Sequence, residues 1–460
     1  MNLKITTRFA LSPTDFMQLN HVRIALFNQL LAASAKGVFL LRIDDIDFTH
    51  ATHEFINEIV HDLQWLRLEW QEGPISGGVH APYLQSERLD IYRRFYTTLE
   101  QLGLVYPCFC RDEQLKMTHK IQVANGQVPH YLGTCRNLSH DEIQRRIAVG
   151  ERPALRFAIP RGQAFEFHDL LKGSRRINHD DVEDFVIQNR DGAFTAIFCD
   201  AIDDALMEVT QVLRDESELT NSLSQLLLLR SLKLREPQYG HMPVVSGFGH
   251  GQFSRNIPEL REQGFLPLAL LNYLARLSFR YHTDACLSLT ELAANFSLLD
   301  INHTAAHYDE AQLLHWQKQA VANLGIDDFC RWGKVEEIPE AKRRDFVHTI
   351  QAHVVFPREV QFWYDVIFGD HLIYTIAQED ELRDAGRQFF ICVAQVLAKE
   401  FSFDAVIYAL QKLGLRGNKL FGPLRLALTS AEQGPDLSKI FMLLTKERVM
   451  QRLEKAKELC

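Results

Sequence analysis

Polar side chains that could contact a phosphorylated ligand lie near the amino terminus, between a predicted strand and a predicted helix. The strand covers about residues 5–10, and a Ser-Pro-Thr turn follows. Apolar residues at helical spacing then predict a helix over about 19–33. Backbone N–H groups at a helix start lie at the positive end of its dipole, where phosphates bind. Gln18, Asn20 and His21 lie at this helix start.

A second polar cluster follows the next predicted strand. Residues 38–43 form an apolar run typical of a buried parallel strand, and Asp44 to Asp47 come directly after it. Another helical pattern follows, so the order strand–helix–strand–helix predicts a doubly wound parallel sheet. In such sheets the ligand lies beyond the carboxyl ends of the strands, where Arg8 and Asp44 are expected. The acidic residues could bind a substrate amine, or they could only cap a helix and solvate a loop.

The composition is that of a globular protein. A length of 460 residues indicates about three domains, and 46% of the residues are hydrophobic. A net charge of -9 argues against a general nucleic-acid binder but allows a local basic groove. No window approaches the roughly 18 apolar residues of a membrane span, and the amino terminus lacks the apolar core of a signal peptide. We expect a cytoplasmic monomer that binds neither membranes nor DNA.

Three of the eight cysteines have a spacing that could hold zinc. They are Cys108, Cys110 and Cys135. Thiolates are preferred ligands in structural zinc sites, which need four ligands. His130 is one candidate for the fourth, since imidazole is a usual ligand. The alternative is three free cysteines, because disulfides are not expected without a secretion signal.

Residues 7–28, TRFALSPTDFMQLNHVRIALFN, resemble the first signature region of class I aminoacyl-tRNA synthetases of the glutamyl type. The family has TRFAPSPTG at the start, a His-Ile-Gly-His motif in the middle and AR-TALFN at the end. The matching residues are Arg8, Phe9, Ala10, Ser12, Pro13, Thr14, Arg23, Ala25, Leu26, Phe27 and Asn28. The motif itself is replaced by Gln18, Leu19, Asn20 and His21. The scaffold is thus similar, while the residues that do the chemistry differ.

The resemblance covers almost the whole chain. Residues 83–92 resemble a family segment with a YFQSERLD pattern, and residues 167–173 resemble FHDLVRG. Residues 261–274 are nearly the family sequence, and residues 414–429 resemble the end of the bacterial anticodon-binding domain. The resemblance implies an α/β fold, in which a Rossmann-type doubly wound parallel sheet carries a connective insertion and an all-α anticodon-binding domain follows.

The resemblance also implies domain boundaries. The first half of the Rossmann catalytic domain is expected at 1–105, and the connective insertion for the acceptor end, with the cysteines, at 106–194. The second catalytic half is expected at 195–240. A stem-contact domain with the family's second signature loop follows at 241–326, and the helical anticodon-binding domain at 327–460.

The resemblance places an amino-acid pocket at seven positions. They are Arg8, Ala10, Ser12, Asp44, Ala196, Asp200 and Arg214. The family has a Glu at the position of Asp44, where it contacts the substrate amine, and a Tyr at Ala196, which forms a pocket wall. The family Arg at Arg214 pairs with the substrate's side-chain carboxylate. A planar guanidinium suits this because it donates two parallel hydrogen bonds.

The family's second signature loop, with a KMSKS motif, corresponds to residues 247–257. Ser254 is kept, the first lysine is Gln252, and the second is Arg255. The resemblance implies ATP binding by Gln18, Asn20, His21 and Arg255. It implies catalytic roles for Gln18, His21, Gln252, Ser254 and Arg255. The implied cofactors are ATP with Mg²⁺, and the implied partners are L-glutamate and a glutamate-type tRNA. Some relatives use Tyr-x-x-x-Cys, which makes Tyr131 the other candidate for the fourth zinc ligand, as an alternative to His130.

The altered motifs predict weakened catalysis. The family's motif histidines and lysines stabilise charge on the α-phosphate and the leaving pyrophosphate. Gln18 and Gln252 carry no charge, and Asn20 puts a side chain where a glycine would let adenine approach. Each lost donor typically costs roughly 10²–10³ in rate. We expect a divergent paralogue that binds tRNA and attaches glutamate weakly or not at all. A working glutamate–tRNA ligase and an enzyme repurposed for another small acid are the alternatives.

Two further expectations concern local structure. Ser86 is expected to cap the helix that follows it. In the carboxyl-terminal third, helical spacing predicts helices over 389–397, 403–413 and 438–453.

Overall fold

The computed structural model describes residues 4–46, 52–127, 129–247, 256–370 and 372–460. The chain divides into two compact units. The first contains Met1–Leu260 and Leu270–Glu310, and the second contains Arg261–Ala269 and Ala311–Cys460. The five-part division expected from the sequence is finer and stays a prediction. Among the described helices, none has the length and apolar character needed to cross a membrane.

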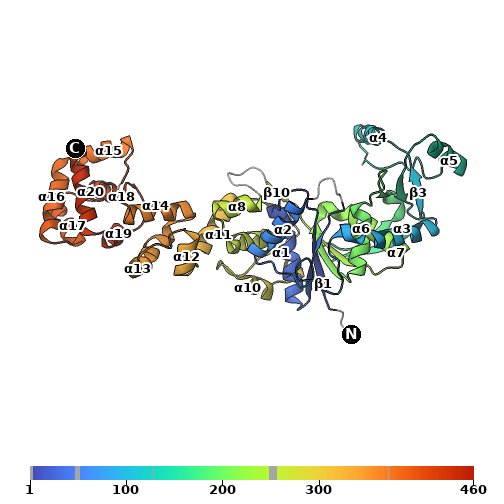
Figure 1. Cartoon of the computed structure of the whole chain (residues 1–460), viewed down its shortest axis with the longest axis horizontal. Coiled ribbons are helices and arrows are strands. Elements are labelled where there is room, and N and C mark those ends of the chain that lie inside the picture. Colours follow the sequence, from blue (N-terminus) through green and yellow to red (C-terminus); the bar gives the residue numbers. More distant parts are fainter. Residues whose placement is uncertain (1–3, 47–51, 128, 248–255, 371) are drawn as a thin grey trace. The chain divides into compact units, whose positions relative to one another are not determined.

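Parallel strands joined by helices form the centre of the first unit. β1 (Thr6–Leu11) pairs in parallel with β2 (Val38–Ile43), and α1 (Leu19–Ser34) connects them. α1 lies against both strands (Figure 1). β8 (Gln211–Asp215) and β9 (Gln238–Met242) form a second parallel pair, connected by α7 (Leu219–Ser231). This is the parallel α/β arrangement predicted from the sequence.

Hydrogen bonds join the two strand pairs at their starts. The Thr210 N–H donates to the Thr6 carbonyl at 2.8 Å, and the Thr6 N–H donates to Thr210 Oγ1 at 2.8 Å. Every residue of β2 is buried, including Arg42. Within each pair the strands are parallel, so their carboxyl ends lie together, and charged side chains collect there.

The first unit contains further elements besides these strands. The helices are α2 (His53–Trp65), α3 (Leu89–Gln101), α4 (Asp112–Ala124), α5 (His140–Ala148), α6 (Ala196–Leu206) and α10 (Leu289–Ala294). α8 (Ile257–Gln263) and α9 (Pro267–Ser278) lie where the chain changes units. The insertion contains an antiparallel sheet of β3 (Val105–Cys108), β4 (Ala154–Phe157) and β7 (Val186–Gln188). It also contains the hairpin of β5 (Ala164–Asp169) and β6 (Gly173–Asn178). β10 (Val245–Ser246) pairs with β11 (Ala306–His307).

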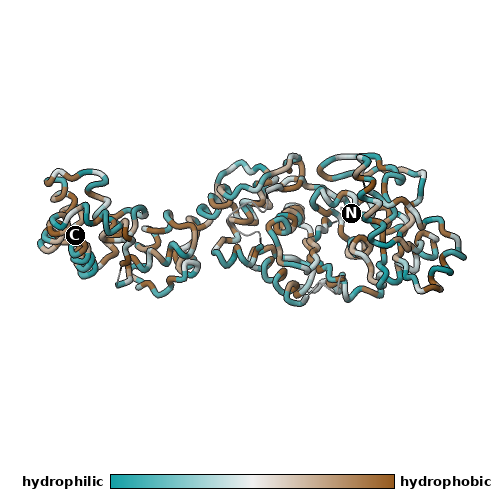
Figure 2. Tube along the Cα trace, turned by 90° about the horizontal axis from the view of Figure 1, so that it is seen from above, coloured by the Kyte–Doolittle hydropathy of each residue, from teal (hydrophilic) through white to brown (hydrophobic). Residues whose placement is uncertain are grey.

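The second unit is built from helices around its own core. The described helices are α11 (Glu310–Ala322), α12 (Ile326–Trp332), α13 (Glu340–Ile350), α14 (Pro357–Phe368), α15 (Ile376–Ala385), α16 (Arg387–Lys399), α17 (Phe403–Lys412), α18 (Asn418–Thr429), α19 (Leu437–Leu443) and α20 (Lys446–Leu459). Phe346, Val360, Phe390 and Leu424 belong to one continuous buried cluster. Figure 2 shows hydrophobic and hydrophilic stretches alternating along these helices, as amphipathic packing requires.

Two local predictions are wrong. The helix expected over 438–453 is interrupted: α19 ends before Leu444, whose backbone is extended, and the Thr445 side chain caps α20 by accepting from the Arg448 N–H. Ser86 does not cap the helix after it. A short 3₁₀ turn, Gln85–Arg88, precedes α3, and the Ser86 hydroxyl donates to Asp45 Oδ2 at 2.7 Å. The Ser86 hydroxyl thus hydrogen-bonds the Asp45 carboxylate instead of capping the helix, as the local pattern had predicted.

A buried ion pair ties this 3₁₀ turn to α6. Arg88 Nε donates to Asp203 Oδ1 at 2.7 Å, and their side chains are 3% and 0% exposed. The Tyr92 hydroxyl donates to the other carboxylate oxygen at 2.7 Å. Asp203 is therefore desolvated and depends on these donors for compensation.

We predict that Arg88→Met lowers the free energy of unfolding by about 3–5 kcal/mol, because it removes the guanidinium that is hydrogen-bonded to the buried Asp203 carboxylate. Arg93→Met is the matched control, since Arg93 pairs with Asp90 at the surface, where the side chains are 64% and 83% exposed. That change should cost about 1 kcal/mol or less. Urea unfolding measures both, and equal effects would contradict the prediction.

Candidate active site

The carboxyl ends of β1 and β2 meet α6 at a network of buried charges. Arg8 Nε and Nη2 donate to the two carboxylate oxygens of Asp204 at 3.0 and 3.2 Å. Arg42 Nη1 donates to Asp204 Oδ1 at 2.7 Å. Burial raises the pKa of Asp204, but Arg8 and Arg42 outweigh it and hold that pKa below its usual range. Asp204 thereby locks two neighbouring strands to one helix.

Arg42 also holds the two acids at the edge of this network. Its Nε lies 2.7 Å from Asp44 Oδ1, and its Nη2 lies 3.1 Å from Asp200 Oδ1. The Asp44 side chain is 8% exposed, and that of Asp200 is 17% exposed. Burial and the neighbouring Asp44 charge raise the pKa of Asp200 to about 7. The charge of this site therefore changes near neutral pH.

Arg214, in β8, uses only part of its hydrogen-bonding capacity. Its Nη1 donates to Ser222 Oγ at 3.2 Å and to Gln225 Oε1 at 3.1 Å, and both acceptors are neutral. Within the described part of the chain, its Nε and Nη2 have no hydrogen-bond partner, and no carboxylate lies at ion-pair distance. Burial, and next the charge of Arg8, lower the pKa of Arg214. A guanidinium in this state is suited to pair with a ligand carboxylate.

The remaining residues predicted for the amino-acid pocket lie at the rim. Ala10 is half-buried near the end of β1, Ser12 is exposed just beyond it, and Ala196 is the exposed first residue of α6. Sequence reasoning missed Arg42, which joins Asp44, Asp200 and Asp204. The available signal was one charged residue inside an otherwise apolar strand.

The nucleotide-binding half predicted from the sequence begins at α1. The Gln18 N–H donates to His21 Nδ1 at 3.2 Å, which leaves the proton of the neutral ring on Nε2. Burial lowers the pKa of His21 and outweighs the nearby Asp15. Asn20 Oδ1 is buried and has no hydrogen-bond partner among the residues that the structure describes. The first turn of α1 therefore presents amide and neutral imidazole groups but no cation.

Three predicted catalytic residues cannot be placed. Gln252, Ser254 and Arg255 lie outside the described residues. The chain resumes beside α1, where Asn256 bridges to Gln18 and the Ile257 N–H donates to the Met17 carbonyl at 2.9 Å. The end of the second signature loop thus lies against the middle of the first signature region, where the altered motif begins.

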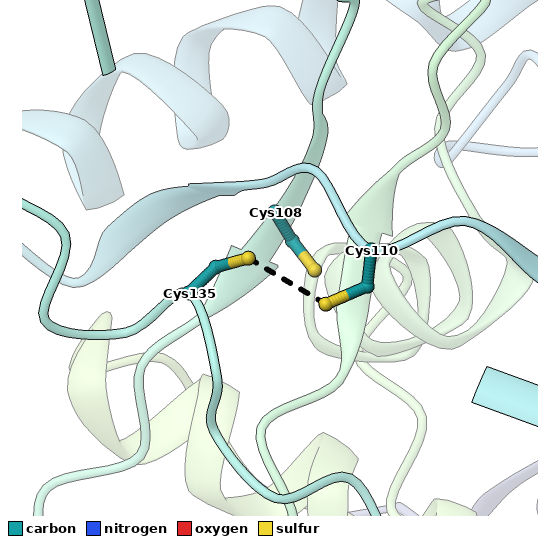
Figure 3. Close-up of side chains that lie close together, drawn as sticks. All are labelled: Cys108, Cys110 and Cys135. Carbon is teal, nitrogen blue, oxygen red and sulfur yellow. Dashed lines mark hydrogen bonds between the residues drawn. The ribbon is translucent and has the colours of Figure 1, made fainter. Parts of the chain in front are cut away.

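The three predicted cysteine ligands gather at the end of β3. Figure 3 shows the sulfur atoms of Cys108, Cys110 and Cys135 close together, and all three lie within 4.8 Å of one another. The Tyr131 hydroxyl is 3.5 Å from Cys108 Sγ. Hydrogen bonds with Cys135, and also with Tyr131 and Arg156, lower the pKa of Cys108 to about 4. His130 is exposed, and its Nδ1 lies 3.3 Å from Gln122 Nε2. The donor set suits a soft cation, with Tyr131 closer than His130 to the thiols.

Family models match most of the chain. The catalytic domain of class I tRNA synthetases (E and Q) matches residues 4–315, and an anticodon-binding domain matches residues 340–457. Two solved structures share the fold: a glutamate tRNA ligase from Elizabethkingia meningosepticum, 23% identical, and a glutamate–tRNA synthetase from Elizabethkingia anophelis, 24% identical. Both matches cover 99% of this chain. They cover 99% of the first solved chain and 100% of the second, and the TM-score is 0.84 for each.

Curated relatives are similar along their full length. Glutamate–tRNA ligase 2 of Coxiella burnetii (strain RSA 331 / Henzerling II) is 43% identical over 463 residues, covering 98% of this chain and 99% of the relative. Glutamate–tRNA ligase 2 of Nitrosococcus oceani is 42% identical over 462 residues, covering 98% of each. With both domain models matched in order, the chain belongs to the glutamate–tRNA ligase family of class I tRNA synthetases.

Proposed function

We propose that this chain binds glutamate-type tRNA and L-glutamate but forms the glutamyl-adenylate slowly or not at all. The observation that carries the proposal is a contrast within one site. Arg214 keeps unused donors for a carboxylate, whereas the first turn of α1 offers no cation to a nucleotide. Recognition of the amino acid is thereby separated from its activation.

The amino-acid half supports glutamate as the ligand. Arg214 would take the side-chain carboxylate through its free Nε and Nη2, as a planar guanidinium does. Asp44, held by Arg42, would take the ammonium group. Asp44 is one methylene shorter than glutamate, so the ammonium must sit closer to β2 than a longer acid would require. The curated relatives are named glutamate–tRNA ligases.

The nucleotide half supports weak activation. ATP with Mg²⁺ supplies the adenylyl group in this family, and the residues facing it must stabilise charge on its phosphates. Gln18 and a neutral His21 can donate hydrogen bonds but bring no charge. The Asn20 side chain lies at the same helix start, and its buried oxygen, which has no partner in the described part of the chain, would accept from a donor on the ligand. The backbone N–H groups at the start of α1 could still donate to the phosphates, but they carry only partial charges.

Binding of tRNA rests on the second unit. An anticodon-binding domain matches residues 340–457, and the described helices of this unit share one hydrophobic core. The altered signature motifs lie outside this domain. We propose that this unit docks the anticodon arm whether or not the catalytic half is active.

A second candidate is activation of another small carboxylate. Ala196 is exposed at the start of α6, so the pocket is open where the family has a tyrosine wall. Arg214 would still bind the carboxylate. Stimulation of ATP consumption by a small acid other than glutamate would favour this candidate.

We predict that glutamate-dependent ATP–pyrophosphate exchange by the wild-type chain is near background with tRNA present. The variant Gln18→His/Asn20→Gly/Gln252→Lys should raise it by about 10²–10³, because it restores donors for the transition state. Retention of tRNA at low salt should be equal in both proteins, which serves as the control. Brisk exchange by the wild type would contradict the proposal.

We predict that glutamate binding strengthens as the pH rises through 7. Ionised Asp200 adds a negative charge next to Asp44, where the ammonium group of the ligand is proposed to lie, while its protonated form does not. Between about pH 6 and 8, one group with a pKa near 7 can change the affinity by about tenfold. Calorimetric titration should show this slope in the wild type and a flat profile in Asp200→Asn. The same slope in both proteins would exclude Asp200 as the titrating group.

We predict that the chain binds about one Zn²⁺, held by Cys108, Cys110, Cys135 and Tyr131. The ion would crosslink the end of β3 to the 131–135 turn. Cys108→Ser and Cys135→Ser should abolish binding measured by elemental analysis, and Tyr131→Phe should weaken it. Cys286→Ser, at a half-buried cysteine outside the cluster, is the control. Full zinc retention by Cys108→Ser would refute the assignment.

A further inference from the structure

A chain of hydrogen bonds runs from Arg214 into the interior. Arg214 Nη1 donates to Ser222 Oγ at 3.2 Å, Ser222 Oγ lies 2.9 Å from His241 Nε2, and His241 Nδ1 lies 2.5 Å from Asp169 Oδ2. Ser222 and His241 are 0% exposed and Asp169 is 1% exposed. The four residues come from β8, α7, β9 and β5, so the chain joins the insertion hairpin to the parallel strands.

The direction of donation is set at the Asp169 end. Burial raises the pKa of Asp169, but hydrogen bonds from His241 and from the backbone N–H groups of Leu171 and Lys172 hold it below its usual range. The ionised carboxylate can only accept, so the ring proton lies on His241 Nδ1. Ser222 Oγ accepts from Arg214 Nη1 and lies 2.9 Å from His241 Nε2, while the Glu218 carbonyl at 3.2 Å is a second acceptor for the Ser222 hydroxyl. The hydrogen bonds of such a chain strengthen one another.

The same three side chains have the connectivity of a Ser-His-Asp nucleophilic triad. Ser222, however, has no exposed surface, and its oxygen already accepts a hydrogen bond from Arg214. A nucleophile needs access to a substrate atom. The arrangement therefore serves the guanidinium rather than a covalent step.

We propose that Ser222, His241 and Asp169 are positioning residues for Arg214, and this inference rests on the role proposed above for Arg214 in binding a carboxylate. The chain holds only Nη1, and because the guanidinium is rigid and planar, fixing Nη1 orients Nε and Nη2 for a ligand. Asp169 supplies a counter-charge from the far end of the chain. A carboxylate bonded directly to Arg214 would instead occupy the place of the ligand.

Glutamate binding to the full chain tests the inference. Ser222→Ala and Asp169→Asn should each raise the Kd for glutamate by about tenfold, while the Kd for ATP stays unchanged, because only the carboxylate receptor loses its orientation. Ser224→Ala is the matched control: it makes the same change two residues away in α7, at a side chain that is 3% exposed. Equal weakening in Ser222→Ala and Ser224→Ala would overturn the inference.

A spectroscopic readout decides the inference even if glutamate does not bind. With ¹⁵N-labelled arginine, the side-chain signals of Arg214, assigned from Arg214→Lys, should report slow guanidinium rotation in the wild type and rotation faster by about threefold or more in Ser222→Ala. Unchanged rotation would overturn the inference. Absence of glutamate binding by the wild type would instead refute the proposed function. Labelling of Ser222 by a fluorophosphonate probe would overturn the positioning role in favour of a nucleophile.

Discussion

The site depends on one buried guanidinium. Arg42 lies in a strand with no exposed residue and contacts Asp44, Asp200 and Asp204 at 2.7 to 3.1 Å. Removing a charge from water costs several kcal/mol unless partners compensate it, so Arg42 and these acids are tolerated only together. Asp204 is also shared with Arg8. The ends of β1 and β2 and the face of α6 are therefore held by charge pairing as much as by packing.

This pairing explains how the two halves of the site can differ so much. The amino-acid half is a network of oppositely charged side chains, and each side chain fixes the position of its partners. Among the described residues, the start of α1 has no such network: His21 accepts from the Gln18 backbone, and Asn20 Oδ1 has no partner there. A change at the start of α1 leaves the network of buried charges intact, because no ion pair joins the helix start to this network among the described residues. This independence is consistent with a fold that persists after its nucleotide motif has changed.

Local pattern accounts for much of the fold. The strand predicted over 38–43 is β2 to the residue, because a short apolar run between polar segments has few other solutions. β1 and α1 differ from prediction by one residue at their ends. The pattern fails where a side chain chooses between a local and a distant partner. Thr445 caps a new helix although helical spacing continues through it, and Ser86 bonds Asp45 instead of the backbone that follows.

The sequence by itself determined the family, the order of strands and helices, and the residue types available at each strand end, since motifs and periodicity are local properties of the chain. Only the tertiary structure decided which charges pair. Arg42 and Asp204 are 162 residues apart, and Asp169 reaches His241 across 72 residues. Such contacts follow from the order of the strands in space and from the pairing of each buried charge with an opposite one. The spacing of residues along the chain does not encode the strand order in space, and it does not encode which charges pair.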